Sequence, residues 1–224
     1  MMFVRDDRHR SEGISAPDAL WNAEAYDAWF VHSPGADIFA VESSALLREV
    51  SPAGGQTILD AGCGTGRLMA AISATGAAVV GVDPDRGMAR IADRLGNGMV
   101  ARSRAEALPF PDGRFDATVA MTVLEFVDDF RIVLQEMARV TRTSGRIVIG
   151  ALNPISPWGL GLLRQRHQVP WIAARFPPRR SLAAELSLYG PTRVTGVALG
   201  GIANARPALL GRYCGFQVIA CLKQ

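Results

Sequence analysis

The chain has 224 residues, of which 49% are hydrophobic, so it is long enough to bury one sizeable core. Its 24 basic and 21 acidic side chains give a net charge of +3, and this near-balance argues against a general nucleic-acid binder. The 3 cysteines are scattered without CxxC spacing, which predicts a reducing, cytoplasmic setting. No apolar run approaches the about 18 residues of a membrane span, and no cluster has metal-ligand spacing.

The N-terminal part of the chain divides into a tail and two predicted helices. Residues 1–16 carry charges of both signs and little apolar pattern, which predicts a mobile tail. The rest, residues 17–224, is predicted to form one domain. A helical pattern with Tyr26 and Trp29 begins at Pro17, and a second helix is predicted from about Ala36 to Val50.

A glycine-rich turn follows the first predicted strand, Thr57–Leu59. The strand leads into Asp60, and glycines then stand at alternate positions, Gly62, Gly64 and Gly66, before a helical segment. Glycine tolerates positive φ and lets a ligand approach the backbone closely. The free N–H groups at the start of the helix favour a polar or anionic group, so the segment predicts a nucleotide-binding turn.

A second acidic residue, Asp83, ends the next predicted strand 23 residues after Asp60. That strand contains Val79, Val80 and Val82, which is typical of a parallel strand buried on both faces. A carboxylate at the carboxyl end of such a strand can accept hydrogen bonds from two vicinal ribose hydroxyls. The alternative is that Asp83 caps the helix that follows it.

Two segments carry a family resemblance. Residues Ile58–Leu68 resemble motif I of class I S-adenosylmethionine (SAM) methyltransferases. Residues Ala105–Phe110, Ala-Glu-Ala-Leu-Pro-Phe, resemble a segment of the branch with ubiquinone and menaquinone methyltransferases, methyltransferase type 11. The resemblance implies an α/β fold with a Rossmann-like, doubly wound, seven-stranded sheet. The sheet is expected to be mostly parallel with an antiparallel C-terminal strand, under a helical cap from residues 17–50 and 152–190.

The resemblance also implies SAM as cofactor and a set of residues that bind it. Relatives usually carry Asp or Asn at the position of Arg104, where the side chain meets the adenine amino group. A guanidinium has only donors and cannot accept that bond, although the backbone N–H of Ala105 can still serve the ring. Glu106 is either a ligand or a residue that fixes the loop. The expected cofactor-binding residues are Asp60, Gly62, Cys63, Gly64, Gly66, Asp83, Pro84, Met88, Ala105, Glu106, Met121 and Thr122.

Three side chains are weak candidates for a catalytic base. Tyr26 stands in a segment that resembles the N-terminal lid of small-molecule methyltransferases. Glu125 follows the fourth predicted strand, where a general base and a surface acid at a helix start are both open, and we favour the surface acid. His167 lies in an arginine-rich segment, and there an exposed side chain is the favoured interpretation.

The segment Leu160–Arg180 combines six basic side chains with interleaved aromatic residues. We interpret it first as a wall of the substrate cap, second as a contact with anionic lipid or an acidic partner, and only third as a nucleic-acid surface. No nucleic-acid partner is therefore expected.

These features predict transfer of a methyl group from SAM to a small molecule, lipophilic or anionic in character, with the acceptor atom left open between O, N and C. A non-catalytic SAM-binding protein is the alternative from another class. An NAD-dependent oxidoreductase is disfavoured, because Arg67 stands where the G-x-G-x-x-G fingerprint has its last glycine and no Tyr-x-x-x-Lys pair is present.

Overall fold

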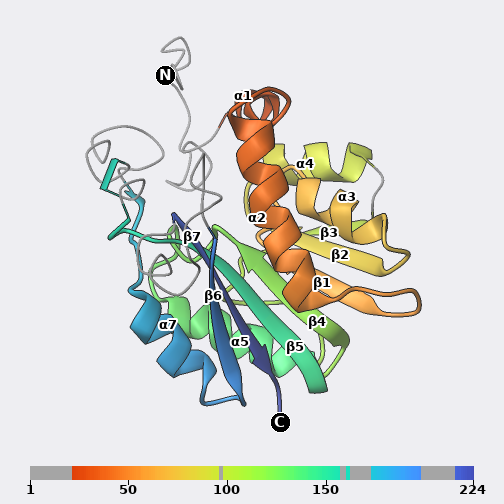
Figure 1. Ribbon diagram of the computed structural model, residues 1–224. Helices are drawn as coiled ribbons and strands as arrows, with labels where there is room; N and C mark the ends of the chain where they lie inside the picture. The colour runs from red at the N-terminus through yellow and green to blue at the C-terminus, as the bar shows by residue number, and fades with distance from the viewer. Residues whose placement is uncertain (1–21, 96–97, 157–159, 162–172, 198–214) are drawn as a thin grey trace.

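The computed structural model describes residues 22–95, 98–156, 160–161, 173–197 and 215–224 (Figure 1). Its centre is a seven-stranded sheet in the order β3-β2-β1-β4-β5-β7-β6. The final strand runs antiparallel to both of its neighbours, and all other pairs are parallel, as predicted. The strands are β1 (Thr57–Ala61), β2 (Ala78–Asp83), β3 (Met99–Arg102), β4 (Phe115–Met121), β5 (Thr141–Leu152), β6 (Thr192–Val197) and β7 (Phe216–Leu222).

Helices cover both faces of the sheet (Figure 1). One face is packed by α2 (Gly35–Val50), α3 (Arg67–Ser73) and part of α4 (Arg86–Leu95). The other is packed by α5 (Phe130–Val140) and α7 (Arg179–Leu186). Neighbouring residues of β1 alternate between the two cores, with Ile58 in the first and Leu59 in the second. This alternation follows from the two-residue repeat of a strand buried on both faces.

The start of β5 differs from the sequence-based expectation. The sequence Thr-Ser-Gly at residues 143–145 predicts a turn before a strand that begins at Arg146, but β5 already begins at Thr141. Phe115 pairs with Thr141 and Ala117 with Arg146, so the residues between them form an irregularity in the strand. Ser144 takes a φ of 64° within it. The predicted turn is therefore an interruption inside one strand.

The cap predicted from residues 152–190 is described only in part. Within it, Leu182 and Leu186 of α7 pack in the core that this helix shares with α5 and the sheet. The helix α7 therefore packs on a face of the sheet. The short helix α1 (Ala23–Trp29) and the start of α2 stand at the carboxyl end of the strands (Figure 1). The predicted tail and the segment 204–212 lie outside the described residues. None of the helices described is both long and apolar enough to cross a membrane.

Candidate functional site

The glycine turn between β1 and α3 has the backbone that its sequence predicts. Gly62, Gly64 and Gly66 all have positive φ, at 85°, 53° and 83°. The N–H groups of Gly62 and Cys63 donate to the carbonyl of Val82 at 2.8 and 2.9 Å, which ties the turn to β2. A Cβ at Gly62 would lie 2.4 Å from Val123 Cγ2, so no larger residue fits there without a shift of its neighbour. The turn therefore needs glycine for conformation and for space.

Asp60, in β1 just before the turn, is a buried carboxyl without a hydrogen-bond partner. It is 1% exposed, and neither of its carboxyl oxygens has a partner among the described residues. Burial, with a smaller contribution from the charge of Asp83, raises the pKa of Asp60 to about 8. A buried carboxyl in this state favours a ligand group that donates hydrogen bonds and carries positive charge.

Asp83, at the end of β2, is already held by backbone donors. Its Oδ2 accepts from the N–H of Gly64 and its Oδ1 from the N–H of Asp85, both at 2.9 Å. Burial raises the pKa of Asp83 to about 6, and these two hydrogen bonds limit the rise. Each oxygen retains a second lone pair for a hydroxyl. It is Asp85, whose Oδ1 accepts from the N–H of Met88 at 2.9 Å, that makes a capping bond at α4.

Tyr26 of α1 covers the glycine turn. A Cβ built on Gly64 would lie 3.7 Å from Tyr26 Cε1, an ordinary contact distance. Burial and the neighbouring acids Asp83, Glu42 and Asp60 raise the pKa of Tyr26 far above its usual range. The phenol is therefore a hydrogen-bond donor at neutral pH, which argues against its role as a base.

Helix α1 is fastened to the glycine turn by an ion pair. Arg67 is the first residue of α3. Its Nε donates to Asp27 Oδ1 at 2.8 Å, and its Nη2 donates to the backbone carbonyl of Asp27. Ala23 packs in a small apolar cluster with Met88 and Ile91 of α4. The predicted cofactor residue Met88 thus lies buried under α1.

On the other side of Asp83, the loop after β3 holds Arg104 against Glu106. Their side chains form an ion pair at 2.7 Å, which is the contact expected of a loop-fixing Glu106. Ala105 between them is buried. The carbonyl of Pro84 accepts from Arg102 Nε at 3.0 Å, which joins this loop to the end of β2.

The end of β4 brings two more predicted residues to the same edge of the sheet. Thr122 takes a left-handed φ of 51°, uncommon for a residue with a branched Cβ. Its N–H donates to the carbonyl of Gly150 at 2.8 Å, and its hydroxyl donates to the carbonyl of Met121 at 2.8 Å. The chain is therefore turned sharply where β4 ends, beside the glycine turn.

The interpretation of Glu125 as a surface acid at a helix start was wrong. Its side chain is 0% exposed, and α5 begins only at Phe130 with Asp129 as its cap. Glu125 Oε1 accepts from the N–H of Leu152 at 2.7 Å, whereas Oε2 has no partner among the described residues. The backbone of Arg175 crosses the turn and donates to the Glu125 carbonyl at 2.6 Å. Burial raises the pKa of Glu125 to about 7.

Glu42 of α2 is a buried acid that the sequence interpretation missed. It is 5% exposed, and burial together with the charge of Glu125 raises its pKa to about 8. A signal was present, because Glu42 stands four residues from both Ile38 and Leu46, on the apolar stripe of its helix. The apolar neighbour Val41, in contrast, is 43% exposed.

The remaining sequence candidates lie apart or outside the described residues. His167 falls outside them, as does most of the basic segment. Of that segment, Arg175 pairs with Asp128 and donates to the carbonyl of Val127. Arg179 and Arg180 are exposed at the start of α7. The described residues hold no group of three or more side chains suited to a metal ion.

Known proteins resemble this chain in sequence and in fold. Residues 59–149 match the family described as "Methyltransferase domain". An uncharacterized protein of Methanocaldococcus jannaschii is 34% identical over 58% of this chain and 59% of its own length. The demethylmenaquinone methyltransferase of Clavibacter sepedonicus is 41% identical over 47% of this chain and 44% of its own.

A solved structure extends the likeness to most of the fold. The SAM-dependent methyltransferase of Thermotoga maritima superposes with a TM-score of 0.70 and 23% identity, over 90% of this chain and 95% of that one. At this identity the likeness concerns the fold. The chain spans about half the length of the curated relatives that it matches in sequence.

Proposed function

We propose that this chain, whose residues 59–149 match the methyltransferase-domain family, is a class I SAM-dependent methyltransferase that transfers a methyl group from SAM to a small molecule. The observation that carries the proposal is Asp60, a buried carboxyl with both oxygens unpartnered among the described residues, beside the glycine turn. Such a group favours a cationic ligand, and SAM carries an ammonium and a sulfonium group.

The surrounding residues fit the rest of that cofactor. We assign Asp83 to the vicinal hydroxyls of the ribose, because each of its oxygens accepts one backbone hydrogen bond and keeps a second lone pair. Gly62 and Gly64 have positive φ and no side chain, so a ligand can approach the backbone closely there. We assign the backbone N–H of Ala105 to the adenine ring and the end of β4, Met121 and Thr122, to the methionine part.

When bound, SAM supplies an activated methyl group, and the chain has to orient the acceptor and keep water away. Tyr26 and α1 cover the glycine turn and serve the second task. Glu125 is the better of the described candidates for a proton acceptor, because a pKa of about 7 suits a general base at neutral pH.

The oxidoreductase alternative fits the charges less well. A nicotinamide dinucleotide would bring its pyrophosphate to the glycine turn. There its negative charge would lie beside the buried carboxyl of Asp60, whose unpartnered oxygens favour a donor with positive charge and not a second anion. The acids at this site therefore favour SAM over NAD.

The acceptor is a small molecule in the proposal, as the name of the demethylmenaquinone relative implies for that enzyme. The expectation of a lipophilic or anionic acceptor, and of contact with anionic lipid, depended on the basic segment 158–180. Within its described part, Arg175 is already paired with Asp128. The exposed Arg179 and Arg180 are the side chains that remain for such a contact.

Two measurements test the proposal. Calorimetric titration with SAM and with NAD should show binding of SAM alone, and binding of NAD without SAM would refute it. Incubation with methyl-labelled SAM and a small-molecule cell extract should then transfer label to an acceptor. SAM binding without any transfer would instead support the non-catalytic alternative.

A further inference from the structure

A second pair of buried acids, Glu42 and Glu125, lies at the carboxyl end of the sheet, outside the residues assigned to SAM. Glu42 is on α2, which packs against β4 and β5, and Glu125 is in the turn after β4. They are 5% and 0% exposed. Two elements far apart in sequence thus bring ionisable groups together in the interior, where an isolated charge is costly.

The two carboxyl groups interact without bonding to each other. Burial raises the pKa of Glu42 and the charge of Glu125 adds to that rise, while α2 packs against β5, whose Leu152 N–H donates to Glu125. Among the described residues, Glu125 Oε1 accepts only from the N–H of Leu152 and Oε2 has no partner. No ion pair of either acid occurs in the described part of the chain. Acceptor capacity is therefore left over at this place, and a cation bound there would stabilise the ionised form of both acids.

The chemistry of the pair narrows the ligand that would satisfy it. A metal ion is disfavoured, because the described residues hold no group of three or more metal-ligating side chains. A neutral hydroxyl would donate one hydrogen bond and leave the charge in place. A protonated amine donates up to three hydrogen bonds and brings positive charge, so it can serve both carboxyls at once.

The pair also lies close to the part of the site that we assign to the cofactor. The charges of Asp83, Glu42 and Asp60 add to the effect of burial in raising the pKa of Tyr26, and the charge of Arg67 lowers it. The ammonium of SAM, assigned to Asp60, accounts for one of these acids. The remaining acids favour a second positive group beside the ammonium of SAM, and a methyl acceptor would lie there.

We propose that Glu42 and Glu125 bind the protonated amino group of the methyl acceptor, so that the acceptor belongs to the amines. The inference rests on the proposed function and names its substrate class. It replaces the lipophilic or anionic acceptor expected from the basic segment, because the described acids are buried and unpaired whereas Arg175 is paired.

The test uses three probes of one shape but different charge: phenethylamine, 2-phenylethanol and 3-phenylpropionate. Each is titrated calorimetrically into the full chain, with and without saturating S-adenosylhomocysteine. The amine should bind at least tenfold more tightly than the other two. Glu125→Gln and Glu42→Gln should each weaken its binding about tenfold to a hundredfold, the range for hydrogen bonds to charged groups.

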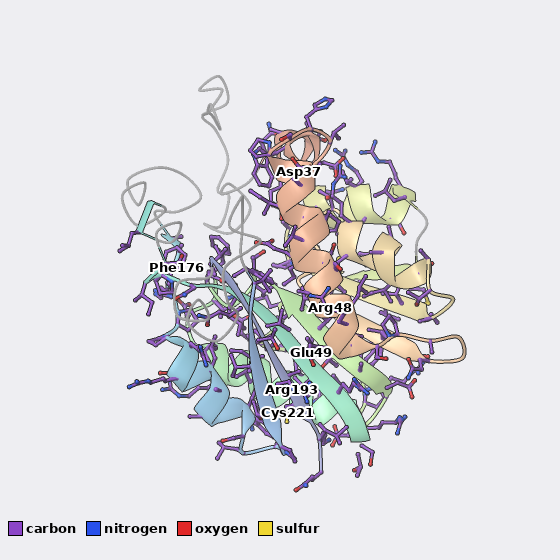
Figure 2. All side chains as sticks on the ribbon, in the orientation of Figure 1. Asp37, Arg48, Glu49, Phe176, Arg193 and Cys221 are labelled. Carbon is purple, nitrogen blue, oxygen red and sulfur yellow. The ribbon has the colours of Figure 1, made fainter. Side chains whose placement is uncertain are left out.

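Glu49→Gln is the matched control, because Glu49 lies near the other end of α2 (Figure 2) and accepts from Thr195 Oγ1 at 3.3 Å. It should leave amine binding unchanged. Thermal unfolding and SAM titration of every variant separate loss of fold from loss of the site, and Glu42→Gln decides the matter if Glu125→Gln does not fold. No preference for the amine, or amine binding unchanged in a folded Glu42 or Glu125 variant, would overturn the inference. Amine binding that persists in a chain unable to bind SAM would refute the proposed function alone.

Discussion

The buried acids in the two halves of the sheet's carboxyl edge differ in how many hydrogen bonds they accept. At the end of β2, both oxygens of Asp83 accept hydrogen bonds from backbone N–H groups of the adjacent turns. Beyond β4, Glu125 has one such bond, and its second oxygen has no partner among the described residues. The half around β2 is therefore preorganised at Asp83, whereas Glu125 in the other half, like Asp60 of β1, is left for a ligand to satisfy.

The difference originates in the local backbone. The glycine turn exposes N–H groups toward the end of β2, because positive φ at Gly62 and Gly64 turns the chain back on itself. The turn after β4 is instead packed with buried apolar residues, Leu124 and Val127, on either side of Glu125. These side chains bring no donor to Glu125, so burial raises its pKa and one backbone hydrogen bond opposes the rise.

The largest loss of stability should come from a change at Gly62, where the glycine turn contacts Val123 of the turn after β4. Gly62→Ala places a methyl group 2.4 Å from Val123 Cγ2 at a φ of 85°. We expect a loss of about 2–5 kcal/mol in the free energy of unfolding, from overpacking together with left-handed strain. Urea unfolding measures it. Gly55→Ala is the control, since Gly55 has a φ of 84° with nothing within 4 Å, and it should cost only about 1 kcal/mol. Equal losses in the two variants would contradict the close contact.

The preorganised half is tested by Asp83→Ala. Loss of a carboxylate that accepts from two ribose hydroxyls and orders Gly64 should weaken SAM binding by about 2–3 kcal/mol, or thirtyfold to a hundredfold. Calorimetric titration gives the affinity. Asp93→Ala, an exposed acid of α4, should leave it unchanged. An affinity within threefold of the original chain after Asp83→Ala would remove this residue from the site.

The pH dependence of stability tests the buried acids of both halves together. The folded pKa values of Asp60 and Glu42 are about 8, and that of Glu125 is about 7. All lie above the unfolded values, so the folded chain binds more protons between about pH 5 and 8. Stability without ligand should therefore fall as pH rises through this window, by at most about 1.4 kcal/mol per pH unit for each acid.

Urea unfolding at several pH values measures that slope. Asp60→Asn should flatten it, whereas Asp93→Asn, which removes an exposed carboxylate, should not. Stability that stays level or increases from pH 5.5 to 8 would show that these acids are ionised at little cost in the folded chain.

The smallest effect is expected at the ion pair that fastens α1 over the glycine turn. Asp27 and Arg67 are 28% and 26% exposed, so Asp27→Asn should cost about 0.5–1 kcal/mol and reduce SAM affinity only a few-fold. The side chains of the ion pair between Glu24 of α1 and Arg90 of α4 are both more than 60% exposed. Glu24→Gln should have no measurable effect, and equal effects of both changes on SAM affinity would deny a special role to the Arg67 contact.

Most of the sheet could be predicted because its signals are local. Runs of β-branched residues, the glycine turn and the acids at strand ends fix β1, β2 and the order of the units. The start of β5 could not be predicted, because Thr141 and Arg146, on either side of a turn-forming sequence at residues 143–145, both pair with β4. Pairing with a neighbouring strand overrides the local preference there.

The acceptor half of the site was harder to predict for the same reason. The burial of Glu125 depends on Leu152 and on the backbone of Arg175, both distant in sequence. Glu42 was open to prediction from its helical spacing to Leu46, but an acid on an apolar stripe gains meaning only beside a second acid. Their coupling is a property of the folded chain.

The proton balance of SAM binding tests the central claim most directly. Unliganded Asp60 is mostly protonated at pH 7, and a cationic group placed against it lowers its pKa. Calorimetric titration of SAM at pH 7 in two buffers of different ionisation enthalpy should show release of a proton, which Asp60→Asn should largely abolish. SAM binding with no proton release, or a release that persists in Asp60→Asn, would contradict the assignment of Asp60 to the positive charge of the cofactor.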